Sequence, residues 1–415
     1  MPTRPGAHHA HEEGGGEETE EEGEEGPVTL DLRQYRGDVR AEVETGGGFL
    51  DRLRVRLAAA DYEHTEFEGS EVGTIFRTQG LEGRLEAVQA DRGGWRGVIG
   101  AQFFLRDFEA IGAEAFVPPN DTSQIGFFTL QEVELGRLEL EGALRFEHSQ
   151  IAAPIRGVER SFDAFSLAAG ASWEVAPRVR VGANVSRSER APSAEELFSF
   201  GPHVATQAFE VGDPTLGKER SLGGEIYARA TANGFQLNAT LFANRFDGYI
   251  FQAATGEEED GLPVFRYFQS DATYWGVELG ATAPLGYVGH WRISVDGVAD
   301  YVEATIGDGG GPVPRIPPLR LLGGIEAASD GIDGRVEVEH VFEQDRVAGL
   351  ETPTGAFTLV NASITWRPWG NRNPTSLILA ANNLFDVEAR RHASFTKDFV
   401  PLAGRDIRLS ARVSF

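Results

Sequence analysis

The chain has 415 residues, a formal net charge of -26, 51 glycines, 27 phenylalanines, one methionine and no cysteine. Without cysteine, neither a disulfide framework nor a thiolate metal site can form. The acidic charge argues against a nucleic-acid partner, because phosphate binding requires basic surface. No run of apolar residues reaches the roughly 18 to 20 that a membrane-spanning helix requires.

Residues 1–27 are a segment of low complexity. His8, His9 and His11 are followed by nine glutamates between residues 12 and 25, which glycines interrupt. Such a composition has nothing to bury, so we expect a flexible segment exposed to solvent. The first residues also lack the apolar core of a secretory signal.

From residue 28 to residue 415 the chain alternates between polar and apolar residues. Residues 52–57 place arginines on one face and aliphatic side chains on the other, which is the period of two that is typical of a β-strand. The same alternation recurs at residues 178–181, 235–241 and 407–415. Helical periodicity is nearly absent, and the sequence therefore predicts an all-β protein.

The connections between the predicted strands alternate between short and long. Short turns are predicted near Gly46, Gly93, Gly136, Pro177, Gly234, Gly286, Gly331 and Gly370. Long loops are predicted near residues 61–72, 109–123, 151–160, 190–218, 252–263, 305–317, 346–355 and 386–403. Outer-membrane barrels have short periplasmic turns and long extracellular loops. The pattern therefore predicts a transmembrane antiparallel β-barrel.

Counting between these connections gives about 17 strands, whereas single-chain bacterial barrels usually have an even number. A plugged barrel of about 22 strands would need roughly five more strands ahead of residue 28. We therefore expect residues 28–415 to correspond to the C-terminal part of such a barrel, and residues 1–27 to be the remnant of a flexible extracellular loop.

Several motifs between residue 28 and the end resemble those of TonB-dependent receptors. They are RAPSAEELF at residues 190–198, DPTLGKE at 213–219, WGVE at 275–278, IPPLR at 316–320, NNLFD at 382–386 and GR at 404–405. The terminal Phe415 resembles the residue that the barrel-assembly machinery reads in such proteins. The resemblance implies an outer-membrane receptor in contact with lipid, and not an enzyme. No plug domain is recognisable, so contact with TonB is expected only through a plug region outside these residues.

Three further motifs are similar to the zinc-uptake branch of that family. They are DYEHTE at residues 61–66, VGTIF at 72–76 and GPHVAT at 201–206. Receptors of this branch also carry a loop rich in histidine and acidic residues, which residues 8–25 resemble. The resemblance implies capture of zinc or another divalent cation at external loops, transfer to a site at the mouth, and passage past a plug that TonB moves. Zinc is then the transported ligand, and no resident cofactor is required.

Imidazole nitrogen and carboxylate oxygen are the strong zinc ligands of a chain without cysteine. Eight of the nine histidines fall in the predicted long loops or beside them, and His290 lies near a short turn. We expect a metal site at the mouth of the barrel, formed by His64 and Glu66 from one loop and His203 from another. Glu63 is a further candidate ligand of this mouth site. A looser capture site in the N-terminal segment would use His8, His9, His11, Glu12 and Glu13.

Plainer interpretations remain open for these residues. The N-terminal segment can be a solvated tail, and a lone histidine in a loop more often meets water than metal. Within transport, the alternative is a receptor for a siderophore or haem, which aromatic and arginine platforms in the loops would favour. From another class, the alternative is a soluble β-rich binding or structural protein. A hydrolase is disfavoured, because no Gly-x-Ser-x-Gly signature is present.

Overall fold

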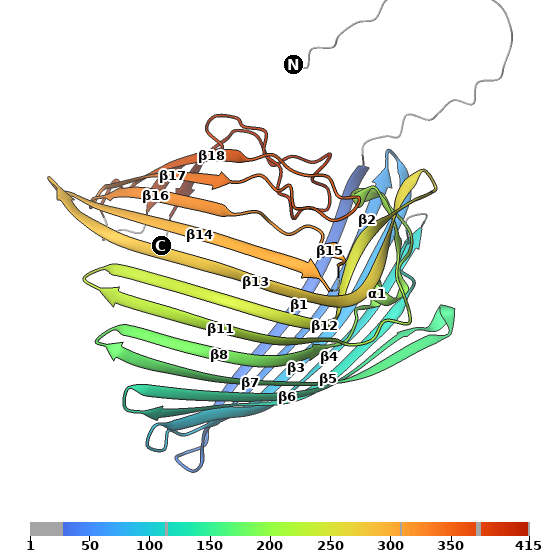
Figure 1. Ribbon diagram of the computed structural model, residues 1–415, viewed down its shortest axis with the longest axis horizontal. Coiled ribbons are helices and arrows are strands. Elements are labelled where there is room, and N and C mark those ends of the chain that lie inside the picture. Colours follow the sequence, from blue (N-terminus) through green and yellow to red (C-terminus); the bar gives the residue numbers. More distant parts are fainter. Residues whose placement is uncertain (1–27, 113–114, 308, 371–374, 414–415) are drawn as a thin grey trace, which may run out of the picture.

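The structure is a computed structural model that describes residues 28–112, 115–307, 309–370 and 375–413. Within these ranges one sheet of 20 strands forms a curved wall (Figure 1). The expected flexible segment, residues 1–27, lies outside the described residues. Among the helices that are described, none is long and apolar enough to cross a membrane.

Three of the 20 strands are short and lie in the connections. They are β9 (Phe200–His203), β10 (Ala208–Val211) and β15 (Gly311–Pro312). The other 17 strands form the wall and agree with the number predicted from the sequence. They are β1 (Val28–Glu44), β2 (Leu50–Glu68), β3 (Glu71–Gln89), β4 (Trp95–Gly112), β5 (Asn120–Leu135), β6 (Leu138–Ala153), β7 (Val158–Ala176), β8 (Val179–Arg190), β11 (Glu219–Ala232), β12 (Phe235–Glu259), β13 (Leu262–Val288), β14 (Trp291–Ile306), β16 (Arg320–Ala328), β17 (Ile332–Val341), β18 (Phe357–Trp366), β19 (Ser376–Asn382) and β20 (Asp406–Arg412).

Each wall strand pairs antiparallel with the next one along the wall, from β1 to β20. The predicted fold, a nearly all-β antiparallel sheet, is therefore confirmed. One helix, α1 (Ala194–Phe198), and two single 3-10 turns, η1 (Pro154–Arg156) and η2 (Val204–Thr206), interrupt the connections. Among the described residues no pairing joins β1 to β20.

The predicted short turns coincide with chain reversals. Gly136 and Gly234 have φ angles of 66° and 84° where β5 meets β6 and β11 meets β12. This left-handed region suits tight hairpins and costs glycine little, because it has no Cβ atom. After Pro177 the positive φ falls on Arg178 instead, at 63°.

Three predicted long loops are mostly strand, and this prediction was wrong. In the first, β2 continues to Glu68 and β3 begins at Glu71. The other two are residues 151–160, where β7 begins at Val158, and residues 252–263, where β12 and β13 form a long hairpin. A strand crosses the hydrocarbon core with about 9–11 residues. Strands of 25 and 27 residues, such as β12 and β13, therefore extend well beyond it.

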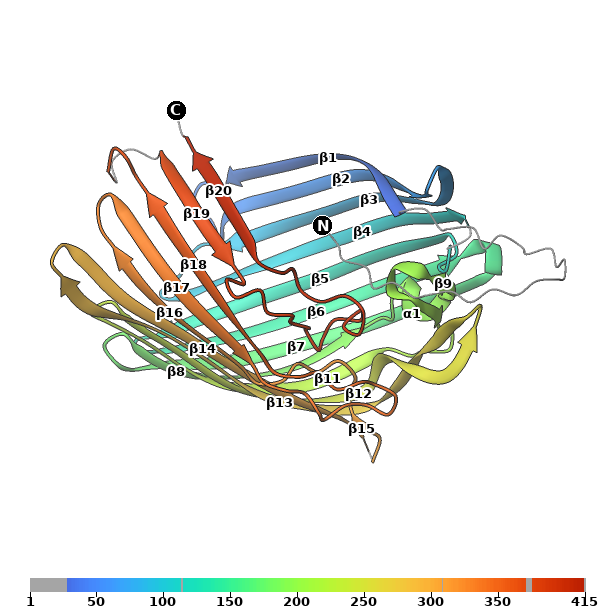
Figure 2. The same cartoon turned by 90° about the horizontal axis from the view of Figure 1, so that it is seen from above.

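The two faces of the wall differ in polarity. On β17, Arg335 binds Asp296 and Glu337 in ion pairs, whereas Val336 and Val338, on the opposite face, are 45% and 43% exposed. Figure 2 shows that the segment between β19 and β20 and the connection with α1 lie over the concave face. This charged, concave face is where the long connections converge.

Candidate functional site

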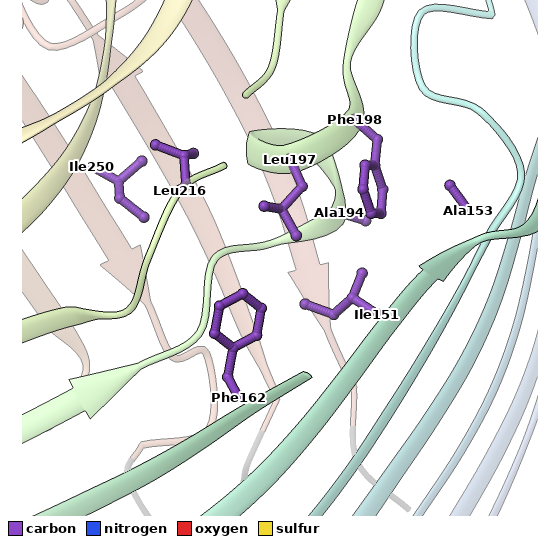
Figure 3. Close-up of a cluster of buried hydrophobic side chains, with 8 residues drawn as sticks. All are labelled: Ile151, Ala153, Phe162, Ala194, Leu197, Phe198, Leu216 and Ile250. Atoms are coloured by element: carbon purple, nitrogen blue, oxygen red, sulfur yellow. The ribbon is translucent and has the colours of Figure 1, made fainter. Parts of the chain in front are cut away.

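Helix α1 fastens the long connection between β8 and β11 to the inside of the wall. It begins at a capping box, in which the Ser193 hydroxyl accepts the N–H of Glu196 at 3.2 Å and the Glu196 carboxylate accepts the N–H of Ser193 at 2.7 Å. Its apolar side packs into the buried cluster of Figure 3. The members of that cluster are Ile151, Ala153, Phe162, Ala194, Leu197, Phe198, Leu216 and Ile250.

Ion pairs hold the two ends of this connection together. The Arg190 guanidinium donates to both carboxylate oxygens of Glu196, at 2.9 and 3.0 Å, and to Glu219 at 3.2 Å. Arg106 on β4 donates to Glu195 of α1 at 3.1 Å. The connection that carries His203 is therefore anchored to the concave face at several points.

His64 and Glu66, for which the sequence predicts a loop, are neighbours on strand β2. The His64 Nε2 atom lies 3.6 Å from Oε1 of Glu66, and the imidazole stacks on Phe76 with 4.6 Å between ring centroids. The His64 Nδ1 atom is buried and has no hydrogen-bond partner in the part of the chain that the structure describes. The pair therefore offers one imidazole and one carboxylate to a ligand.

Glu63 lies on the other face of the same strand, because successive side chains of a strand point to opposite faces. Its carboxylate accepts hydrogen bonds from Arg33 at 3.3 Å and from Arg77 at 2.9 Å, on the two strands beside it. Glu63 and His64 therefore do not approach one site together.

His203 on β9 has a carboxylate partner of its own. Its Nδ1 atom lies 2.7 Å from Oε1 of Glu210 on β10, and its ring stacks on Phe116 at 4.3 Å. The Gln252 amide donates to the same carboxylate at 3.0 Å. His203 is thus held on a short hairpin by residues that the sequence did not associate with it.

The described residues contain no group of three histidine, aspartate or glutamate side chains placed to hold a metal ion. His64 with Glu66, and His203 with Glu210, form two separate pairs. The other candidate ligands, His8, His9, His11, Glu12 and Glu13, lie outside the described residues. The mouth site with His64, Glu66 and His203 stays a prediction.

A second polar cluster, which the sequence did not single out, joins two other long connections. His392 is 2% exposed, and its Nε2 atom lies 3.2 Å from Oε1 of Glu351. Its Nδ1 atom lies 3.0 Å from the Thr354 hydroxyl oxygen. The Glu351 carboxylate also accepts the backbone N–H of Arg315 at 2.8 Å and that of Ala348 at 3.1 Å. Only the folded chain brings these residues together.

A pocket of about 180 Å³ opens beside this cluster. Arg315, Phe265 and Phe395 line it, together with Glu351 and Lys397. The two phenylalanine rings are 4.7 Å apart, and the Arg315 guanidinium lies 5.2 Å from the centre of the Phe395 ring. The pocket therefore combines an aromatic wall with a cation, which is the kind of platform expected of a siderophore or haem receptor.

The charge of Arg315 has no carboxylate partner in an ion pair among the described residues. Its guanidinium donates to the backbone oxygen of Gln252 at 3.2 Å. Burial lowers the pKa of Arg315, and the nearby negative charge of Glu351 partly opposes that shift. The sequence places residue 315 in a long loop, but no local pattern separates this arginine from the others.

A model of the family described as "TonB dependent receptor-like, beta-barrel" matches residues 23–384. The rhizobactin receptor of Rhizobium meliloti (strain 1021) is 22% identical over 345 residues, which cover 75% of this chain and 44% of that receptor.

Two solved structures share the fold. The copper transporter OprC superposes with a TM-score of 0.79 and 18% identity over 92% of this chain and 65% of that chain. The FrpB iron transporter from Neisseria meningitidis (F3-3 variant) gives a TM-score of 0.69 and 14% identity over 92% and 63%. The chain spans less than half the length of the rhizobactin receptor and less than two thirds of either transporter.

Proposed function

This chain belongs to the family of TonB dependent receptor-like β-barrels, and we propose that it forms the mouth of a receptor that takes up a metal held in an anionic organic chelate. The β-barrels of this family are outer-membrane proteins and receptors, not enzymes, so the chain is assigned to the outer membrane. Similar proteins are named as a rhizobactin receptor, a copper transporter and an iron transporter, which supports a metal-containing cargo.

The observation that carries the proposal is the pocket around Arg315. Guanidinium groups recognise carboxylates in bidentate geometry and stack on aromatic rings. Here the guanidinium lines a cavity, stacks on Phe395 and forms no ion pair with a carboxylate of the described residues. A metal chelate that presents carboxylate or catecholate oxygens would neutralise this charge and pack against Phe265. The siderophore interpretation therefore accounts for the pocket better than a bare zinc ion does.

Binding to the purified full chain tests the proposal. We expect a ferric chelate, either ferric citrate or a ferric catecholate, to bind at least about tenfold more weakly to Arg315→Gln, because a charged hydrogen bond is lost. Arg315→Lys should recover part of the affinity. Arg408→Gln serves as control, since Arg408 pairs with Asp406 on β20 and does not line the pocket. Equal binding of every chelate to Arg315→Gln and to the unchanged chain would refute the pocket.

Uptake of zinc or another divalent cation is the second candidate. It is supported by the pair of His64 and Glu66, in which the Nδ1 atom of His64 is buried and unpartnered, and by the resemblance to the zinc-uptake branch. Capture by His8, His9 and His11 belongs to the same proposal. In both candidates, we propose that TonB would act through a plug region to drive passage across the membrane.

A further inference from the structure

Three arginines form a row across the first three strands of the wall. The register places Arg40 of β1 opposite Arg56 of β2, and Arg56 opposite Arg84 of β3. Neighbouring strands are about 4.8 Å apart, so these like charges are adjacent. Like charges directly opposite one another destabilise a sheet. We call these three residues the arginine row.

The arginine row lies on the concave face. The side chain of Arg106 points to this face, because it binds Glu195 of helix α1, which lies over the concave face (Figure 2). Gly80 of β3 is paired with Arg106, and Arg84 lies four residues further along the same strand. Since side chains alternate between faces, Arg84 shares the face of Arg106. Arg56 and Arg40 lie on that face too, because residues paired across neighbouring strands point to the same side.

A pocket of about 230 Å³ lies over the arginine row. All three arginines line it, and Gln102 of β4 lies at its side. Arg84 is held in place, because its Nε donates to Glu86 at 2.7 Å and its guanidinium stacks on Phe128 at 4.2 Å. The pocket therefore has one fixed wall.

The carboxylates near the row do not neutralise it. Arg36 engages both oxygens of Asp38, each at 2.9 Å, so Arg40 has only a Coulombic attraction to that carboxylate. Among the described residues, neither Arg40 nor Arg56 forms an ion pair or a side-chain hydrogen bond. Glu82 also lines the pocket without an ion pair. Two unpaired guanidinium groups thus face a single unpaired carboxylate, which leaves an excess of positive charge.

We propose that the arginine row binds an oxyanion, a carboxylate or phosphate group, between Arg40 and Arg56 with Arg84 as the fixed side. Guanidinium groups donate in a planar fork that matches both kinds of oxyanion. The bound anion neutralises the two free charges and removes the repulsion across the strands. This site is distinct from the pocket around Arg315 and does not depend on which cargo the receptor carries.

The oxyanion has two possible sources. One is a diffusible anion in the lumen. The other is the chain's own acidic segment, whose nine glutamates lie between residues 12 and 25. Val28 begins β1, the strand that carries Arg40, and residues 12–27 extended at about 3.4 Å each reach roughly 54 Å. The segment is therefore long enough to return along its own strand to Arg40.

The test is calorimetric titration of the full chain with citrate and with inorganic phosphate at constant ionic strength. We expect saturable binding that becomes at least about tenfold weaker in Arg40→Gln and in Arg56→Gln. Arg145→Gln is the matched control, since Arg145 is already paired with Glu147. Absence of saturable binding of either anion both to the unchanged chain and to a chain that lacks residues 12–25, or equal binding to Arg56→Gln, would overturn the proposal.

A chain that lacks residues 12–25 distinguishes the two sources. Tighter binding of citrate after this deletion would identify the acidic segment as the occupant, and unchanged binding would identify a diffusible anion. Thermal unfolding without added anion separates a binding role from a structural one. In the chain that lacks residues 12–25, Arg56→Gln should unfold at the same or a higher temperature, because repulsion is relieved. A lower unfolding temperature there would show that Arg56 supports the fold.

Discussion

Glu351 lies against His392, with 3.2 Å between Oε1 and Nε2, and this contact joins the connection between β19 and β20 to that between β17 and β18. Both residues are largely shielded from solvent, since the side chain alone is 1% exposed for His392 and 11% exposed for Glu351. The same carboxylate accepts two backbone N–H groups, from Arg315 and Ala348. The shape of the pocket around Arg315 therefore depends on this one carboxylate.

Replacement of Glu351 should loosen the mouth without unfolding the wall. In Glu351→Gln the charged hydrogen bond is lost, and we expect local opening of residues 346–355 and 386–403 to become easier by about 1–3 kcal/mol. Hydrogen exchange of peptides from these segments measures this change. Glu388→Gln is the control, because that carboxylate is 70% exposed. Unchanged exchange in Glu351→Gln would contradict the role given to this residue.

The same carboxylate predicts a pH dependence. Burial raises the pKa of Glu351, but hydrogen bonds from His392 and from two backbone N–H groups outweigh burial and hold the pKa below its ordinary value. A depressed pKa stabilises the folded arrangement fully above the unfolded value, about 4.3, and this stabilisation is lost as pH falls through the folded value. We expect protection of residues 346–355 to fall below about pH 4. In Glu351→Gln this part of the pH dependence should disappear.

Zinc titration examines the second candidate function. If the ion is held by His64 with Glu66 and by His203 with Glu210, His64→Ala and His203→Ala should each weaken binding about 10–100-fold, because a site of fixed geometry depends on each ligand. Deletion of residues 8–25 should have a smaller effect, since that segment offers interchangeable ligands. His340→Ala is the control, because His340 bonds to the Thr358 hydroxyl. Wild-type affinity in both histidine variants would exclude the mouth site.

The orientation of the wall can be checked by labelling. The chain has no cysteine, so single cysteines can be introduced freely. Ala205→Cys, in the long connection with α1, should react with a membrane-impermeant maleimide on intact cells. Ala232→Cys, beside the short turn at Gly234, should react only after the outer membrane is permeabilised. The reverse pattern would invert the proposed topology.

The sequence by itself determined the class of fold, because strands and tight turns are specified by residues that are close together in the chain. Alternation at residues 52–57 gives a strand with one charged and one aliphatic face, and Gly136 and Gly234 allow tight reversals. Hairpins between neighbours need no other information, so the count of 17 wall strands could be obtained from turns alone. The positions at which the hairpins end could not be obtained from the sequence. Residues 61–68 of β2, for example, stay paired with β3 beyond the length that is needed to cross a membrane.

Only the tertiary structure decided which side chains meet. The sequence placed His203 and His392 in long connections, but their carboxylate partners, Glu210 and Glu351, were not identified. The arginine row likewise follows from the register of three strands, since no single strand contains it. Contacts between segments distant in the chain depend on strand register and on how each connection folds over the concave face. The alternation of polar and apolar residues predicts neither the strand register nor the path of the connections.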